Sequence, residues 1–177
     1  AKPDRVIVAN WWNPPYLIPL VEVVPGPNTS KFSIEVTKEF LKKINKKSVV
    51  LNKESLGFIG NRLQFALLRE AISLVEKGIA SPEDIDEVVK SGFGRRLAIA
   101  GPFQVFDLAG WDTISTIMKE LFPVLENTSK VSDVVNQKVI DGHLGVKSSK
   151  GFYSWDKDIV DEFRKGIVQK LSDIDRL

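Results

Sequence analysis

Short runs of hydrophobic residues near the start of the chain predict three extended segments. Residues 5–9 are almost all apolar and β-branched, which is typical of a strand buried on both faces of a parallel sheet. Residues 20–24 end at the turn Pro25-Gly26-Pro27, and residues 47–52 form the third segment. Because no crossover units accompany these segments in the sequence, we expect them to be the edge of a larger sheet.

After residue 27 the hydrophobic residues recur at helical spacing. One helix is expected from the capping residues 28–30 to about Asn45. Its predicted apolar face consists of Phe32, Val36, Phe40 and Ile44. The longest helix is expected over residues 56–77 and ends before Gly78, because glycine is favoured just after a helix.

A further helix is predicted by its start signal, Ser81-Pro82-Glu83-Asp84, which combines a hydroxyl cap, a proline and two acids. This helix ends near Gly92, and a connector rich in glycine and arginine follows over residues 92–102. More helices are expected at residues 103–109, 112–125, 131–140 and 158–171. The predicted fold class is therefore mainly α, a helical bundle with short strands at its N-terminal end.

Composition excludes several classes of protein. The 177 residues suffice for a compact unit, and the formal net charge is +2 with acids and bases interspersed. That charge pattern gives no support to nucleic-acid or membrane-surface binding. With no cysteine and a single histidine, His143, thiolate sites and multi-histidine metal sites are excluded. No segment approaches the roughly 18 apolar residues of a membrane span, so we expect a cytoplasmic protein.

The segment Asn-Trp-Trp-Asn-Pro-Pro-Tyr-Leu-Ile-Pro-Leu-Val-Glu-Val-Val, residues 10–24, holds the first candidate site. Glu22 lies across a proline-rich turn from Asn10, so its carboxylate can return to that position. Such a carboxylate would orient an imidazole base, whereas the amide of Asn10 has no useful basicity near neutral pH. On its own, Glu22 is more simply interpreted as a charged strand residue. Trp11 and Trp12 are expected to be core or interface anchors.

The segment Gly57-Phe58-Ile59-Gly60-Asn61-Arg62-Leu63 holds the second candidate site. Its glycines allow close backbone approach, and the first N–H groups of the following helix favour negative charge on a nearby oxygen atom. The alternative is an ordinary helix start with Asn61 facing solvent.

These motifs, in this order, resemble the 3-hydroxyacyl-CoA dehydrogenase family from about Arg5 to Trp155. In that family the residue aligned with Asn10 is the catalytic histidine, and the acid aligned with Glu22 holds it. The resemblance also implies substrate contacts for Asn61 and Asn13.

The resemblance implies NAD as cofactor, although nothing in the chain matches the family's glycine-rich dinucleotide loop. We therefore expect the cofactor site to be absent from this chain. Residues 1–27 would be remnant strands and the catalytic-segment loop of the nucleotide domain. Residues 28–177 would form a helical substrate and dimerisation domain, of the type found at the C-terminus of 6-phosphogluconate dehydrogenase.

The implied function is that of the C-terminal half of an NAD-dependent 3-hydroxyacyl-CoA dehydrogenase of fatty acid metabolism. The complete enzyme would oxidise (S)-3-hydroxyacyl-CoA to 3-ketoacyl-CoA, and this chain is expected to be inactive alone. Its expected partners are an acyl-CoA-type substrate, a second copy of the chain in a homodimer, and a separate Rossmann domain. Two alternatives stay open: a non-catalytic dimerising or binding module, and half of a sugar-acid or carnitine dehydrogenase, whose lambda-crystallin-type relatives carry a similar string.

Overall fold

The computed structural model describes residues 2–174, so the outermost residues of both predicted domains, 1 and 175–177, lie outside the described part. The strands are β1 (Ile7–Trp11), β2 (Leu20–Pro25) and β3 (Lys47–Val50). The α-helices are α1 (Lys31–Lys43), α2 (Gly60–Glu76), α3 (Pro82–Ser91), α4 (Phe93–Leu97), α5 (Pro102–Ala109), α6 (Trp111–Leu121), α7 (Asp133–Ile140) and α8 (Lys157–Ile174). Two 3-10 turns lie at Pro3–Arg5 and Val146–Ser148. None of the helices between residues 2 and 174 is long and apolar enough to cross a bilayer.

The chain divides into two compact units, and each is described by itself. The first unit contains residues 2–64 and 156–174 of the described chain, and the second contains residues 65–155. Helix α2 begins in the first unit and continues into the second. The mainly α class predicted from the sequence is confirmed.

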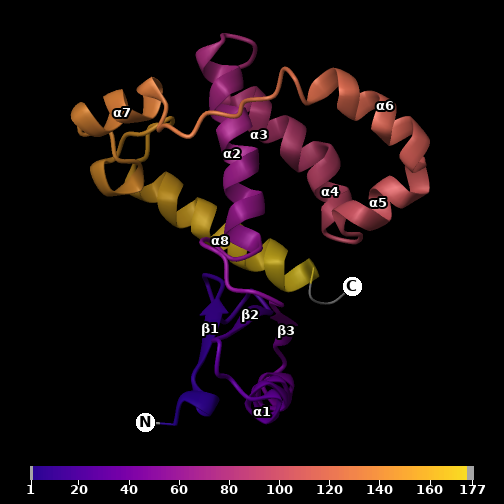
Figure 1. The fold of residues 1–177 in the computed structure, drawn as a ribbon. Helices are drawn as coiled ribbons and strands as arrows, with labels where there is room; N and C mark the ends of the chain where they lie inside the picture. The colour runs from indigo at the N-terminus through magenta and orange to yellow at the C-terminus, as the bar shows by residue number, and fades with distance from the viewer. Residues whose placement is uncertain (1, 175–177) are drawn as a thin grey trace. The chain divides into compact units, whose positions relative to one another are not determined.

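The first unit is built on a three-stranded sheet in the order β1-β2-β3 (Figure 1). Strand β1 is antiparallel to β2, while β2 and β3 are parallel and joined through α1. The expectation that no crossover accompanies the extended segments is therefore wrong, because α1 is the crossover between β2 and β3. The prediction that the first apolar run is buried on both faces of a parallel sheet is wrong, since Val6 is 61% and Val8 49% exposed. The physical reason is the connection: residues 12–19 are too few for a parallel crossover, which needs a dozen or more.

The core of the first unit joins β2 to α1. Val21 and Val23 are fully buried against Leu41, which is 1% exposed. Because side chains alternate across a strand, Glu22 between the two valines points to the opposite face of the sheet. The sheet therefore has an apolar face at Val21 and Val23, and the carboxylate of Glu22 lies on its other face.

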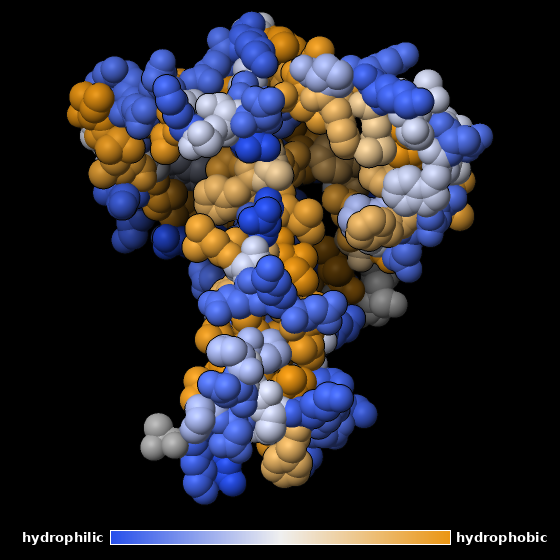
Figure 2. Space-filling model, in the orientation of Figure 1, coloured by the Kyte–Doolittle hydropathy of each residue, from blue (hydrophilic) through white to orange (hydrophobic). Residues whose placement is uncertain are grey.

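The apolar face predicted for α1 does not meet the sheet. Phe32 is 76% exposed and Phe40 56%, whereas Leu41 and the half-buried Ile34 pack inward. Both sets of residues have helical spacing, and only the sheet decides which set is covered. In Figure 2, hydrophobic residues are likewise exposed among hydrophilic ones on the face that is shown.

In the second unit, acidic side chains of α2 hold the segment between α6 and α7, which crosses this helix in Figure 1. Glu70 accepts the backbone N–H of Glu126 in this segment at 2.7 Å, and Glu76 accepts that of Val134, in the first turn of α7, at 3.1 Å. The connector predicted over residues 92–102 differs from expectation, because it contains the short helix α4. The start predicted for α3 is confirmed, since Ser81 accepts the N–H of Asp84 at 3.1 Å.

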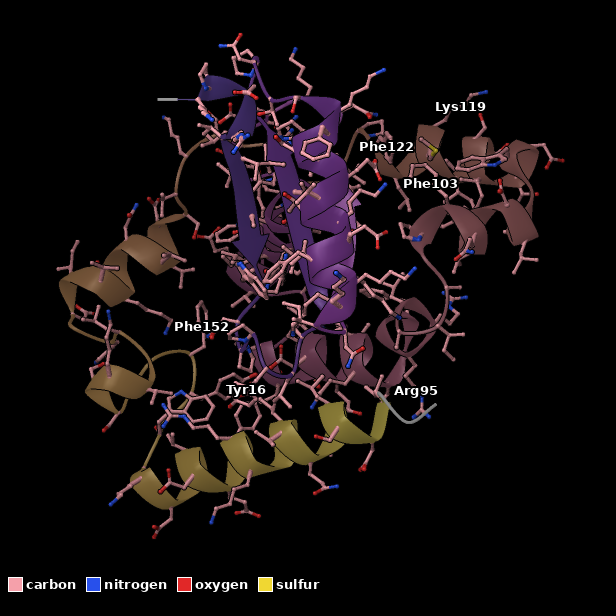
Figure 3. The ribbon with its side chains drawn as sticks, turned by 90° about the horizontal axis from the view of Figure 1, so that it is seen from below. Tyr16, Arg95, Phe103, Lys119, Phe122 and Phe152 are labelled. Carbon is pink, nitrogen blue, oxygen red and sulfur yellow. The ribbon has the colours of Figure 1, made fainter. Side chains whose placement is uncertain are left out.

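Aromatic and charged side chains order the second unit further. Phe103 of α5, labelled in Figure 3, lies 6.5 Å from the ring of Trp111 on α6. Tyr153 donates a 2.9 Å hydrogen bond to Asp86 of α3. Burial, followed by this hydrogen bond and the charge of Asp86, raises the pKa of Tyr153 to about 12. The segment Lys150-Gly151-Phe152-Tyr153 is therefore held against α3.

Ser149 occupies a backbone conformation that favours glycine, with φ of 57°. We expect Ser149→Gly to raise the free energy of unfolding by about 1 kcal/mol, because the left-handed region costs a residue with a Cβ about that much. Chemical denaturation followed by circular dichroism measures the change. Ser148→Gly is the matched control and should be destabilising, since the Ser148 hydroxyl accepts the N–H of Leu144 at 2.7 Å. A loss of stability in Ser149→Gly would contradict the prediction.

Candidate active site around Glu22

The candidate active site is built around the buried side chain of Glu22, in the middle of β2. Glu22 is 1% exposed and is paired across the antiparallel ladder with Asn10 of β1. Paired residues on neighbouring strands present their side chains on the same face of a sheet. The backbone register alone therefore brings together the two residues that the sequence had paired.

Four N–H groups donate to the Glu22 carboxylate. Asn10 Nδ2 and Trp12 Nε1 donate to Oε2 at 2.9 and 3.2 Å. The backbone N–H groups of Ile59 and Gly60 donate to Oε1 at 2.8 and 3.0 Å. One side chain thus joins strand β1, the loop that follows it, and the start of helix α2.

These hydrogen bonds select the ionised form of Glu22. Burial raises the pKa of the carboxyl, but the four hydrogen bonds together outweigh burial and hold the pKa below its usual value. Backbone and indole N–H groups can only donate, so a protonated Glu22 would turn its own O–H toward donors. Among residues 2–174, no lysine, arginine or histidine forms an ion pair with Glu22. The site therefore holds a buried negative charge that is stabilised by dipoles and not by a cation.

The start of α2 is adapted to this carboxylate. A negative charge at a helix N-terminus satisfies free N–H groups and complements the positive end of the helix dipole. Gly60, the first residue of α2, lies against the ring of Trp12: a Cβ at this position would come within 2.1 Å of Trp12 Cζ2. Glycine is required here because the indole, which itself donates to Glu22, occupies the space of a side chain.

The other predicted site residues, Asn61 and Asn13, are not among the donors to the carboxylate. Asn61 is exposed in the first turn of α2, and Asn13 is exposed and precedes Pro14 through a cis peptide bond. Within the described chain neither makes a hydrogen bond to Glu22. Their roles in substrate binding stay predictions.

Sequence reasoning missed two supports of the site. It did not identify Trp12 as a donor to Glu22, although Gly60 was a signal that something approaches the backbone closely there. It also missed Lys46, whose ammonium donates to the carbonyls of Pro15 and, at 3.1 Å, Ile18. These contacts fasten the proline-rich loop, which carries the exposed Tyr16 labelled in Figure 3.

Cofactor and metal binding place separate demands on the residues. A dinucleotide needs a turn with several glycines between a strand and a helix. In the described β2-α1-β3 unit that turn has Gly26 as its glycine, and Ser30 caps α1 by accepting the N–H of Ser33 at 3.1 Å. These residues do not by themselves fit a dinucleotide. No group of three or more His, Cys, Asp or Glu side chains between residues 2 and 174 could hold a metal ion.

We predict that Glu22→Gln lowers the free energy of unfolding by about 2 kcal/mol at neutral pH, because the amide group turns N–H donors toward N–H donors. A carboxyl whose pKa is lowered in the fold stabilises the fold at pH values above its ordinary pKa, and this contribution is lost as the pH falls through the lower folded pKa. The difference between the two proteins should therefore shrink in acid.

Urea denaturation followed by tryptophan fluorescence, over a range of pH, measures this difference. The exposed Glu39 of α1 provides the matched control, Glu39→Gln, for which no such difference is expected. Equal stability of wild type and Glu22→Gln at neutral pH would contradict the assignment of a structural anion.

Comparison with known proteins identifies the family of this chain. Residues 57–155 match the family model of the 3-hydroxyacyl-CoA dehydrogenase C-terminal domain, and residues 1–55 match that of the 3-hydroxyacyl-CoA dehydrogenase NAD binding domain. The second match supports NAD at the level of the family and leaves the predicted absence of a cofactor site unconfirmed.

Three curated relatives are dehydrogenases. The 5-formyl-3-hydroxy-2-methylpyridine 4-carboxylate 5-dehydrogenase of Mesorhizobium japonicum is 33% identical over 175 residues, covering 99% of this chain and 57% of that protein. A 3-hydroxyacyl-CoA dehydrogenase of Gibberella moniliformis is 36% identical over 176 residues, covering 95% and 54%. An L-carnitine dehydrogenase of Mesorhizobium japonicum is 40% identical over 143 residues, covering 78% and 39%. The chain spans about half the length of the first two.

Solved structures agree with these relatives. A 5-formyl-3-hydroxy-2-methylpyridine 4-carboxylic acid 5-dehydrogenase, described as an NAD+ dependent dismutase, matches with a TM-score of 0.94 at 32% identity, covering 98% of this chain and 56% of that one. A 3-hydroxyacyl-CoA dehydrogenase of Archaeoglobus fulgidus matches with a TM-score of 0.60 at 30% identity, covering 96% and 59%. The resemblance drawn from the motifs is confirmed, and the chain belongs to the 3-hydroxyacyl-CoA dehydrogenase family.

Proposed function

We propose that this chain is the substrate-side half of an NAD-dependent dehydrogenase that oxidises an (S)-3-hydroxyacyl-CoA to the 3-ketoacyl-CoA. The observation that carries the proposal is the buried Glu22 carboxylate, which accepts a 2.9 Å hydrogen bond from the side chain at position 10. In pairs of a catalytic base and an orienting acid, a buried carboxylate accepts a hydrogen bond from the side chain of the base and fixes its orientation.

Position 10 is where the base of such a reaction belongs. An imidazole there would donate one N–H to Glu22 Oε2, leaving its other nitrogen free to take the proton of the substrate hydroxyl. The Glu22 anion would then stabilise the imidazolium. With Asn10, the amide can make the same hydrogen bond to Glu22 but has no basic nitrogen. We therefore propose that the chain binds its substrate in the family manner and transfers the hydroxyl proton poorly.

Two asparagines complete the proposed substrate site. Asn61 is exposed in the first turn of α2, close to the N–H groups that accompany the helix start. Its amide is suited to hydrogen-bond the substrate oxygen on which charge develops. Asn13, on the exposed proline-rich loop, is proposed as a second polar contact.

The wider organisation is proposed from the same family membership. The family matches divide the chain between residues 55 and 57, later than the boundary expected between residues 27 and 28. The part from residue 57 onward would form a substrate and dimerisation bundle of the 6-phosphogluconate dehydrogenase C-terminal type, in a cytoplasmic homodimer. Exposed hydrophobic side chains in the second unit support association. Examples are Phe103, Leu108 and Ile140, which are 74%, 89% and 77% exposed.

A second candidate function has its own supporting observation. The 0.94 TM-score to an enzyme of a pyridine carboxylate, together with 40% identity to an L-carnitine dehydrogenase, supports a small carboxylate as the alternative to an acyl-CoA substrate. A non-catalytic dimerising module is the third candidate and is favoured by Asn10 alone.

Asn10→His is the decisive substitution. We expect it to raise NADH formation from 3-hydroxybutyryl-CoA at least about a hundredfold, the scale of general-base catalysis, measured by absorbance. The rate should increase with pH through the titration of the introduced imidazole. The assay is run with and without an added NAD-binding domain from a relative, which also tests whether the chain is inactive alone.

Two controls separate catalysis from other effects. The double variant Asn10→His/Glu22→Gln should lose most of the gain, because the imidazole is then no longer held by an anion. L-carnitine replaces the acyl-CoA in a parallel assay to identify the substrate class. A folded Asn10→His variant that binds cofactor and substrate but forms no NADH from either would favour the binding module.

A further inference from the structure

A second candidate site lies beside the Glu22 cluster, within the first unit. A cavity of about 420 Å³ opens where β3 ends and α2 begins, lined by residues 50–53, by Ser55 and by residues around the start of α2. Ligands of parallel sheets bind outside the carboxyl ends of the strands, and β2 and β3 form the parallel pair here. The volume is in the range of small-molecule sites.

The lining of this cavity has one sign of charge. Lys53 and Arg62 contribute two positive side chains, and Asn52 and Ser55 add polar groups. No acidic residue lines the cavity, and within residues 2–174 neither cation forms an ion pair. Two cations that share a recess without a counter-ion attract an anionic ligand.

Apolar side chains provide the rest of the lining. Phe58 and Ile59 precede α2, and Leu63 follows in its first turns. Ile59 belongs to both sites, since it lines the cavity while its backbone N–H donates to Glu22 at 2.8 Å. A ligand in the cavity would therefore contact Ile59, whose backbone N–H is one of the donors to Glu22.

We propose that this cavity is an anion subsite, in which Arg62 and Lys53 bind the carboxylate of a small substrate and Phe58 and Ile59 contact its apolar body. The inference rests on the proposed dehydrogenase function, since it assigns the part of the substrate that does not react. Arg62 supplies a planar fork that matches a carboxylate, and Lys53 adds a point charge. The phosphate of an acyl-CoA carries the same kind of charge and is the second source to be distinguished.

The test is calorimetric binding of matched probes to the full chain. Pyridine-4-carboxylate should bind at least about tenfold more tightly than its neutral amide, which has the same ring. Arg62→Gln and Lys53→Gln should each weaken binding of the acid about tenfold and leave the amide unchanged. Arg62→Lys should restore part of the loss, because the charge returns without the fork.

Matched controls are available in the same unit. Arg164→Gln in α8 and Lys43→Gln in α1 remove exposed cations away from the cavity and should leave binding of the acid unchanged. Circular dichroism checks that each variant is folded. Should Arg62→Gln not fold, Lys53→Gln, in the loop after β3, decides the question.

Coenzyme A is titrated alongside the pyridine carboxylate. If coenzyme A binds and the two cavity substitutions weaken it, while the pyridine carboxylate does not bind, the anion is the phosphate and the subsite stands. Equal binding of acid and amide together with no effect on coenzyme A, or a loss equal to that of the Arg164→Gln control, overturns the subsite. The readout needs no turnover, so a failure of the subsite is distinguishable from a failure of the Asn10→His assay.

Discussion

The structure around the site depends on one constraint, the burial of an ionised carboxylate without a cation beside it. Removing a charge from water is costly unless hydrogen bonds replace the lost hydration. At Glu22 the replacement comes from four N–H donors on β1, on the following loop and at the start of α2. Each of these segments must therefore hold its position for the charge to be tolerated, and the charge in turn keeps the three segments together.

This constraint explains local choices that would otherwise be independent. Trp12 donates its indole N–H to Glu22, and its ring then occupies the space where Gly60 would carry a side chain. The first N–H groups of α2 reach the carboxylate because the helix begins at that glycine. Trp12, Glu22 and Gly60, which are separated in the sequence, thus constrain one another through direct contacts.

The fold and the proposed reaction make different demands on the side chain at position 10. Asn10 satisfies Glu22 as a donor, so the fold does not require an imidazole there. The proposed proton transfer does require one, because an imidazole combines a donor for the carboxylate with a nitrogen that is basic near neutral pH. The neighbouring cavity adds the positive side chains of Lys53 and Arg62, which the cluster lacks.

Sequence alone determined the local elements and the pairing of Asn10 with Glu22, because caps, proline and glycine signals and short apolar runs act over a few residues. The starts of α1 and α3 agree with their hydroxyl caps, and strand β2 lies where its apolar run predicted. Tertiary structure alone decided the direction of β1, the choice of Leu41 over Phe40 as the buried face of α1, and the indole and backbone donors to Glu22. These features depend on which distant surfaces meet, and a helix with two apolar faces or a strand with one apolar run is compatible with several partners. Which surfaces become buried decides between these alternatives. At Glu22 the decision depends on a buried carboxylate whose charge is stabilised only when its N–H donors are all in place.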